Sequence, residues 1–422
     1  MVLPGIVPQD GGILTQIYMV ISIIGFLAFP ILLLFGSRIM IWQIDRKVSS
    51  VMDYLEAYRN DTKAMFLDNL SSNIGGKTEQ KFETLRDFKF SAPTMLDPAG
   101  TVGKLENVLD ASESKFTRFV EANADTEDPE ELANLNMAFK GVMGTHQIYK
   151  VLRHYRELLV KTQNFQLVGM IQMVLPIYEE LAESQKEATR AFVNGDPIGD
   201  AIGPLVAAKF ISSEPEEIAD DIIRSKEEVA GNEVHVIKSN GPGARLGKYG
   251  DAIDEIADEV DAIITVDAGA KFEGEQTGDI SEGVGVMMGG PGVEKSKIEE
   301  AAVEHDLPLE GIIIKQSPPE ASKPMKKEIY EAYKPAVDKV EELVEEIDGT
   351  VAVIGVGNTC GIGNQRTEVT NVASSLQKYW DEYEQQEEED VSYMGLMQVM
   401  PGGNAAEMDS ALEKFLWKLP RL

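Results

Sequence analysis

The sequence has a single cysteine, Cys360, in 422 residues. One thiol excludes an intrachain disulfide framework and is typical of a reducing cytoplasm. Basic residues are also scarce, with 39 Lys and Arg against 71 Asp and Glu and a formal net charge of -32 at pH 7. Because binding to a polyanion requires clustered bases, this charge balance argues against a nucleic-acid partner.

Charge is almost absent between Ile13 and Trp42, where Arg38 is the only charged residue. About 20 apolar helical residues span a bilayer, so this run predicts a transmembrane helix with the lipid bilayer as partner. A cleaved signal peptide is the alternative, but no base precedes the run, which is long and lacks a small-residue cleavage site. Arg38, Arg46 and Lys47 mark the cytoplasmic side. The expectation is a single-pass cell-membrane protein with its N-terminus outside and its C-terminal domain in the cytoplasm.

Apolar residues continue beyond the run in alternating steps of four and three, at Ile44, Val48, Val51, Leu55 and Tyr58. This spacing predicts an amphipathic helix over residues 43–70. The stripe has two interpretations. It is either the seam of a coiled coil between copies of the chain, which predicts a homo-oligomer, or a face that packs on the chain's own helices.

The remaining pattern predicts two further regions. Residues 71–215 are predicted to form a helical domain, with a loop at 71–80 and helical periodicity from 92 to 211. Residues 216–422 alternate helical segments with apolar runs at 233–238, 262–267, 283–288, 311–316 and 350–355. Apolar strands separated by helices predict a doubly wound, Rossmann-like parallel sheet in an α/β domain, followed by C-terminal helices. The acidic run 387–390 is interpreted as a solvated loop. The domain boundaries are then 1–12, 13–42, 43–70, 71–215 and 216–422.

In a parallel sheet, ligands bind at the carboxyl ends of the strands, so the loops after the predicted strands hold the candidate site. Two of these loops are rich in glycine, which lets backbone N–H groups approach an anion. Neither has the spacing of a P-loop or of a dinucleotide fingerprint. The ligand-binding candidates are Gly241, Gly243, Gly355, Gly357, Asn358, Gly361 and Gly363. Arg245 and Lys248 are candidates to hold the phosphate of a nucleotide or other small phosphorylated ligand, with a turn of solvated bases as the alternative.

Carboxylates supply a second candidate chemistry. Asp267 follows an apolar strand, and Glu273 and Glu275 lie in the next loop. Oxygen ligands of this kind can hold Mg²⁺, and the alternative is a solvated acidic loop. Cys360 lies in the most glycine-rich loop, either as a nucleophile or as a small residue in a tight turn.

Four segments carry a resemblance: PIGDAIGP (197–204), GPGARLGK (241–248), DAGAKFEGEQTG with EGVGVMMGGPG (267–278 and 282–292), and VIGVGNTCGIGN (353–364). With the N-terminal apolar run, they resemble an uncharacterised archaeal family of membrane-anchored proteins, known only as a domain of unknown function. The resemblance implies no activity, so it assigns no catalytic residue.

Two functions follow as hypotheses. The first is a membrane-anchored oligomeric scaffold whose cytoplasmic α/β domain binds a small ligand, such as a nucleotide. The second is a membrane-associated, Mg²⁺-dependent enzyme that acts on a nucleotide or a phosphorylated substrate. Fold class alone does not decide between a binding protein and an enzyme.

Overall fold

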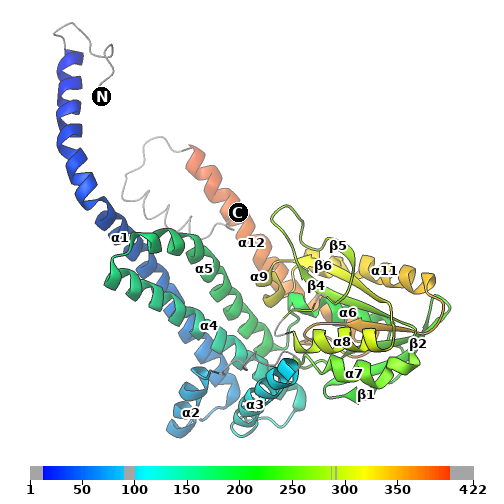
Figure 1. Ribbon diagram of the computed structural model, residues 1–422. Helices are drawn as coiled ribbons and strands as arrows, with labels where there is room; N and C mark the ends of the chain where they lie inside the picture. Colours follow the sequence, from blue (N-terminus) through cyan, green and yellow to red (C-terminus); the bar gives the residue numbers. More distant parts are fainter. Residues whose placement is uncertain (1–12, 90–99, 287, 290–291, 400–422) are drawn as a thin grey trace. The chain divides into compact units, whose positions relative to one another are not determined.

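The computed structural model describes residues 13–89, 100–286, 288–289 and 292–399 (Figure 1). The predicted segment 1–12 and the C-terminal helices predicted beyond residue 399 lie outside the described residues. The chain forms two compact units, Met1–Ala57 with Ile148–Glu179, and Tyr58–Gln147 with Glu180–Leu422.

Three long helices, α1 (Ile13–Leu70), α4 (Pro129–Thr162) and α5 (Phe165–Asn194), each contribute a segment to the first unit. The predicted stripe is buried there: Ile44, Val48, Val51 and Leu55 are at most 5% exposed, and Tyr58 is half-buried. Leu152 on α4 and Ile171 on α5 are fully buried in the same unit. The Arg156 Nε on α4 donates to Asp45 Oδ1 on α1 at 2.8 Å. Packing within the chain therefore accounts for the stripe without a partner helix.

Among the described residues, no helix combines the length and the apolar character needed to cross a bilayer. The predicted transmembrane helix is therefore wrong, and so is the single-pass membrane localisation inferred from it. The run Ile13–Trp42 is the first part of α1, which continues without a break to Leu70. At the end of this run Ile41 is buried by protein. Earlier in the run, Ile21, Ile24 and Phe26 are at least 60% exposed, so the apolar character of this segment does not record burial by other helices.

The helical part of the second unit is built around phenylalanines. The ring of Phe139 on α4 lies 5.1–5.8 Å from the rings of Phe66, Phe82, Phe116 and Phe119. These residues come from α1, from α2 (Gly76–Arg86) and from α3 (Thr101–Glu121). Aromatic pairs at such distances add to the stabilisation from burial. The predicted helical region is confirmed.

The sheet is mixed, with strand order β1-β2-β3-β7-β4-β6-β5. Its strands are β1 (Glu216–Ala219), β2 (Ile222–Val229), β3 (Asn232–Ser239), β4 (Ala262–Ala270), β5 (Ile280–Val284), β6 (Leu309–Gln316) and β7 (Val351–Gly355). The four central strands β3, β7, β4 and β6 are parallel, whereas β1, β2 and β5 pair antiparallel.

The prediction of a Rossmann-like parallel sheet is therefore wrong at both edges. Antiparallel neighbours can be joined by short turns, whereas parallel ones need long crossovers. Two short turns occur here, with left-handed backbone at Asp221 in one and at Ala230 and Gly231 in the other. The sequence of β2, IIRSKEEV, is too polar to have been recognised as a strand.

Helices cover both faces of the sheet (Figure 1). One face carries α7 (Tyr249–Ile256), followed by η3 (Ala257–Glu259), and α8 (Val293–Glu304). The other carries α6 (Ile202–Phe210) and α11 (Tyr333–Glu346), with η2 (Gly199–Ala201), α9 (Pro318–Ser322), α10 (Lys327–Glu331) and η4 (Val369–Asn371) nearby in the chain. The last helix, α12 (Val372–Val399), includes residues 387–390, so this acidic run is helical and not a loop.

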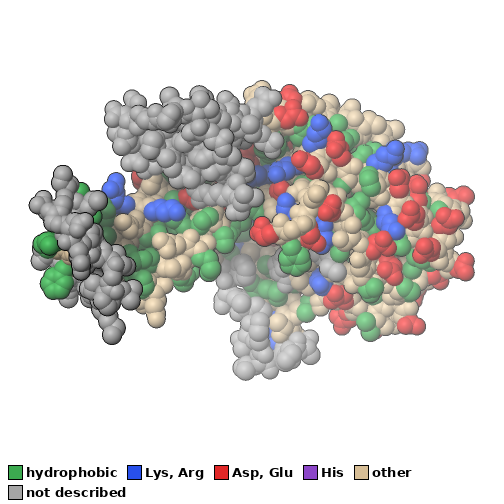
Figure 2. All heavy atoms as spheres, turned by 90° about the horizontal axis from the view of Figure 1, so that it is seen from above, with side chains coloured by type: hydrophobic (Ala, Val, Ile, Leu, Met, Phe, Trp, Pro, Cys, Tyr) green, Lys and Arg blue, Asp and Glu red, His purple; other side chains and the backbone are tan. Residues whose placement is uncertain are grey.

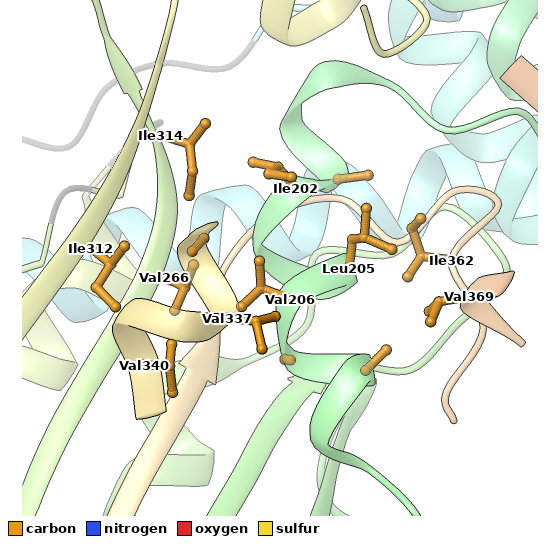
Figure 3. Close-up of a cluster of buried hydrophobic side chains, with 14 of the residues drawn as sticks. Ile202, Leu205, Val206, Val266, Ile312, Ile314, Val337, Val340, Ile362 and Val369 are labelled. Atoms are coloured by element: carbon orange, nitrogen blue, oxygen red, sulfur yellow. The ribbon is translucent and has the colours of Figure 1, made fainter. Parts of the chain in front are cut away.

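Helix α6 is the centre of the larger core. Ile202, Leu205 and Val206 pack among β4, β6 and α11, where Val266, Ile312 and Val337 lie (Figure 3). The helix also touches the sheet through its backbone. A Cβ on Gly203 would lie 2.1 Å from the Val356 carbonyl oxygen and 2.5 Å from that of Val266. The absence of a side chain at residue 203 lets the start of α6 reach the ends of β4 and β7.

We expect Gly203→Ala to lower the free energy of unfolding by about 1–3 kcal/mol or more, because the added methyl overpacks a backbone contact. Urea denaturation measures the change. The matched control is Gly103→Ala in α3, where a Cβ meets nothing within 4 Å. That substitution should stabilise the protein by about 0.5–1 kcal/mol through helix propensity. Equal effects of the two substitutions would contradict the close contact at α6.

Candidate functional site

The carboxyl ends of β3, β7, β4 and β6 lie at one edge of the sheet, because these strands are parallel. The loops that follow them are brought together as predicted. Strand β5 is the exception, because it runs antiparallel and its carboxyl end lies at the opposite edge. The predicted GGPG loop (289–292) includes residues that lie outside the described part of the chain. The candidate site is therefore built from four loops and from the start of α6.

Asp267 is the most unusual residue at this edge. It lies inside β4, which continues to Ala270, and not at the strand's end as predicted. Its side chain is 4% exposed. Oδ1 accepts a hydrogen bond from the Ala268 N–H at 2.7 Å, but Oδ2 is buried without a hydrogen-bond partner among the described residues. Desolvation raises the pKa of Asp267 well above its usual value, and the charge of Asp200 raises it further.

Asp200 is the second carboxylate, and it lies in η2 directly before α6. The residue as a whole is partly exposed, while its carboxylate is desolvated, and one carboxylate oxygen accepts a hydrogen bond from the Asn358 N–H at 2.9 Å. Desolvation raises the pKa of Asp200, although this hydrogen bond acts in the opposite direction. η2 packs against β4, and the charge of Asp200 raises the pKa of Asp267, so the two carboxylates are near enough to interact and are called the acidic pair below. No described Lys or Arg lowers the pKa of either group.

Rigid neighbours hold the acidic pair in place. The Tyr249 hydroxyl donates to the Gly355 carbonyl oxygen at 2.8 Å, and the Ser239 N–H donates to the Tyr249 oxygen at 3.2 Å. Burial raises the pKa of Tyr249, so the hydroxyl keeps its proton. Gly357 has a φ of +137°, and a Cβ there would lie 2.0 Å from the Asp200 carbonyl oxygen. Tyr249 thus joins the ends of β3 and β7, and Gly357 lets the loop after β7 approach the backbone of Asp200.

The basic candidates for phosphate binding are both paired with carboxylates. Arg245 donates from Nη1 and Nη2 to the two carboxylate oxygens of Glu130, at 2.7 and 3.0 Å, and its Nε lies 3.1 Å from Asp221. The Lys248 Nζ donates to Asp110 at 2.6 Å. These pairs connect the loop after β3 to the helical part of the unit. Neither base is left unpaired for a phosphate group.

Lys238, at the end of β3, is a further buried base. Its Nζ donates to the Ser239 carbonyl oxygen and to Asn364 Oδ1, both at 2.8 Å. Desolvation lowers the pKa of Lys238 to about 7. Asn364 Oδ1 also accepts from the Gly241 N–H, so this amide joins the loops after β3 and β7. The role of Lys238 in the described structure is to connect these loops.

The predicted Mg²⁺ ligands do not come together. Glu273 is exposed, and Glu275 accepts from the Phe272 N–H and pairs with Lys315 at 3.3 Å. In the described part of the chain, no three His, Cys, Asp or Glu side chains form a group that could hold a metal. The acidic pair is a group of two, and it shares only Asp267 with the predicted set.

The other predicted candidates form the frame of the site. Cys360 is fully buried, and burial raises its pKa, which is the reverse of what a nucleophilic thiol requires. Gly243 donates its N–H to Glu130, and Gly361 has a φ of +69° with Pro197 directly beside it. A Cβ on Gly363 would lie 2.3 Å from Glu368. These residues hold the loops in position and do not contact the acidic pair through the hydrogen bonds described.

Sequence reasoning missed Asp200, Tyr249 and the carboxylate partners of the bases. A signal for Asp200 was available, because an acid directly before the wholly apolar segment AIGPLVAA (201–208) has no role in packing. In a chain this acidic, single carboxylates are hard to distinguish. Acidic side chains are scattered over the face drawn in Figure 2, among Lys and Arg. Asp267 differs from these acids because it is buried, and the tertiary structure, not the local sequence, decides which acids are buried.

Two family models match the chain. Residues 22–195 match the N-terminal domain described as a protein of unknown function (DUF1512), and residues 198–363 match the C-terminal domain of unknown function (DUF1512). The matches show neither an archaeal origin nor a membrane anchor, and the archaeal origin stays a prediction. No curated protein and no solved structure matches the chain.

The buried carboxylate predicts a pH dependence. Because the pKa of Asp267 is raised on folding, the folded state binds its proton more tightly than the unfolded chain does. The stability contributed by the protonated carboxyl is complete below about pH 4 and is lost as the pH rises through the folded-state pKa. At pH 8 we expect Asp267→Asn to be more stable than the wild type by about 1–3 kcal/mol, the cost of an unsatisfied buried polar group.

Urea denaturation between pH 4 and 8 measures this difference, which should shrink toward pH 4. Asp254→Asn on the exposed side of α7 makes the same chemical change without burial. It should show no such trend. A difference that grows as the pH falls would contradict the raised pKa.

The Arg245–Glu130 pair can be tested by Glu130→Gln. We expect a loss of about 1–3 kcal/mol, because the partly buried guanidinium keeps Asp221 but loses its bidentate carboxylate. The midpoint of urea denaturation measures the loss. Glu131→Gln, at the exposed neighbouring residue, is the control and should change stability by less than about 0.5 kcal/mol. Similar losses in the two variants would show that the ion pair does not stabilise the unit.

Proposed function

We propose that the α/β domain of this chain, which belongs to the DUF1512 family, binds a small, positively charged ligand at Asp200 and Asp267. The activity of the family is unknown, so the proposal is based on the residues of the chain itself. The observation that carries the proposal is the unpartnered Oδ2 of a carboxylate that is only 4% exposed. Buried polar groups without a partner are rare and costly in proteins, and functional sites are where they are found.

The charge of the ligand follows from the acidic pair. Desolvation raises the pKa of both carboxylates, the charge of Asp200 raises that of Asp267 further, and no described base offsets these effects. A positively charged ligand would favour the ionised carboxylates, and its binding energy would replace the missing ion pairs. An anionic ligand would meet two carboxylates and no available base. Asp200 is half-buried, so the ligand reaches the pair from its side.

The contacts of Arg245 and Lys248 give less support to the predicted nucleotide or phosphate ligand. A phosphate would have to separate Arg245 from Glu130 or Lys248 from Asp110. The predicted oligomeric scaffold and the predicted enzyme stay predictions. For the scaffold, the stripe predicted as the seam between copies, Ile44–Leu55, is buried in the described structure. For the enzyme, a second reactive group would be needed beside the acidic pair.

Thermal unfolding of the full chain with added ligands tests the proposal. Mg²⁺, Ca²⁺, methylammonium and spermidine are compared with inorganic phosphate, at constant ionic strength. We expect at least one cation to raise the melting temperature of the wild type, because a ligand that binds only the folded state stabilises it by mass action. The same cation should have little effect on Asp267→Asn.

Asp254→Asn is the control and should respond as the wild type does. Stabilisation by phosphate that Arg245→Met abolishes would show that the phosphate hypothesis is correct instead. The absence of a shift with every cation, or equal shifts in wild type and Asp267→Asn, would overturn the proposed function.

A further inference from the structure

We infer that the positively charged ligand is a divalent metal ion of the Mg²⁺ class, bound between the side chains of Asp200 and Asp267. This inference rests on the proposed function and makes its ligand specific. It replaces the predicted set of Asp267, Glu273 and Glu275, which the structure does not bring together. Asp267 alone is common to both sets.

Charge is the reason for a divalent ion. Two ionised carboxylates carry two negative charges, and one Mg²⁺ neutralises both. A protonated amine neutralises one charge and leaves the second carboxylate buried without a counterion. Two bases of the loops at this edge are engaged elsewhere, with Lys238 bound to Asn364 and Arg245 bound to Glu130. The neutralising charge therefore has to come from outside the protein.

The number of protein ligands distinguishes Mg²⁺ from Ca²⁺. Ca²⁺ takes six to eight oxygen ligands, whereas Mg²⁺ is commonly held by one or two carboxylates and keeps several waters. The described site has two carboxylates, and one oxygen of Asp200 is already bound to the Asn358 N–H. Water on the half-exposed side of Asp200 would complete the coordination. A direct bond to Asp267 Oδ2 would give that oxygen its missing partner.

Mn²⁺ is the probe, because it shares the ligand preferences of Mg²⁺ and its free form is measured by electron paramagnetic resonance. Titration of the full chain with Mn²⁺ should show one site that Mg²⁺ displaces. Asp200→Asn and Asp267→Asn should each weaken Mn²⁺ binding at least tenfold. Asp254→Asn, Glu273→Gln and Glu275→Gln are the matched controls and should bind Mn²⁺ as the wild type does. Circular dichroism confirms that each variant is folded.

Methylammonium separates this inference from the proposed function. If methylammonium stabilises the wild type but not Asp267→Asn, and Mn²⁺ does not bind, the metal inference is wrong and the proposed function stands. If neither cation binds, both are wrong. Mn²⁺ binding that survives both Asp200→Asn and Asp267→Asn places the metal elsewhere and overturns the inference. Loss of Mn²⁺ binding in Glu273→Gln but not in Asp200→Asn overturns it as well.

Discussion

The contact between the start of α6 and the ends of β4 and β7 is the constraint on which the rest of the α/β domain depends. It is a contact of backbone with backbone, made possible by Gly203, Gly355 and Gly357. On one side it holds the apolar residues of α6 in the larger core, between the sheet and α11 (Figure 3). On the other it places η2 over the carboxyl edge of the sheet. The same contact therefore anchors the core and builds the site.

The acidic pair is a consequence of this arrangement. The position of η2 brings Asp200 to the side of β4 where Asp267 lies, and the loop after β7 supplies the Asn358 N–H. Once the backbone closes around them, both carboxylates lose water without gaining a base. Their raised pKa values result from this loss of water. The free-energy cost of burying the two carboxylates opposes the stability that the packing of α6 provides. A site that destabilises its own fold is typical of ligand-binding and catalytic positions.

The bases near the edge have a different role. Arg245, Lys248 and Lys238 each hold a loop in place by binding a carboxylate or an amide. Arg245 binds Glu130 on α4, and Lys248 binds Asp110 on α3, so these two bases join the loop after β3 to the helices. The loops that frame the site are thereby fixed to the helical part of the same unit. Arginine suits this role, because its planar group binds a carboxylate with two hydrogen bonds.

The sequence by itself determined the local features of this protein: the helical region, the four central strands and the convergence of their loops at one edge. Periodicity and glycine content record such features directly. It also singled out Asp267, although not its partner. Only the tertiary structure decided that Ile44 is buried within the chain and that Arg245 is paired. It also decided that the edge strands are antiparallel and that Asp200 lies beside Asp267. Each of these depends on which segments distant in the chain meet and exclude water, and neither hydropathy nor residue type records that.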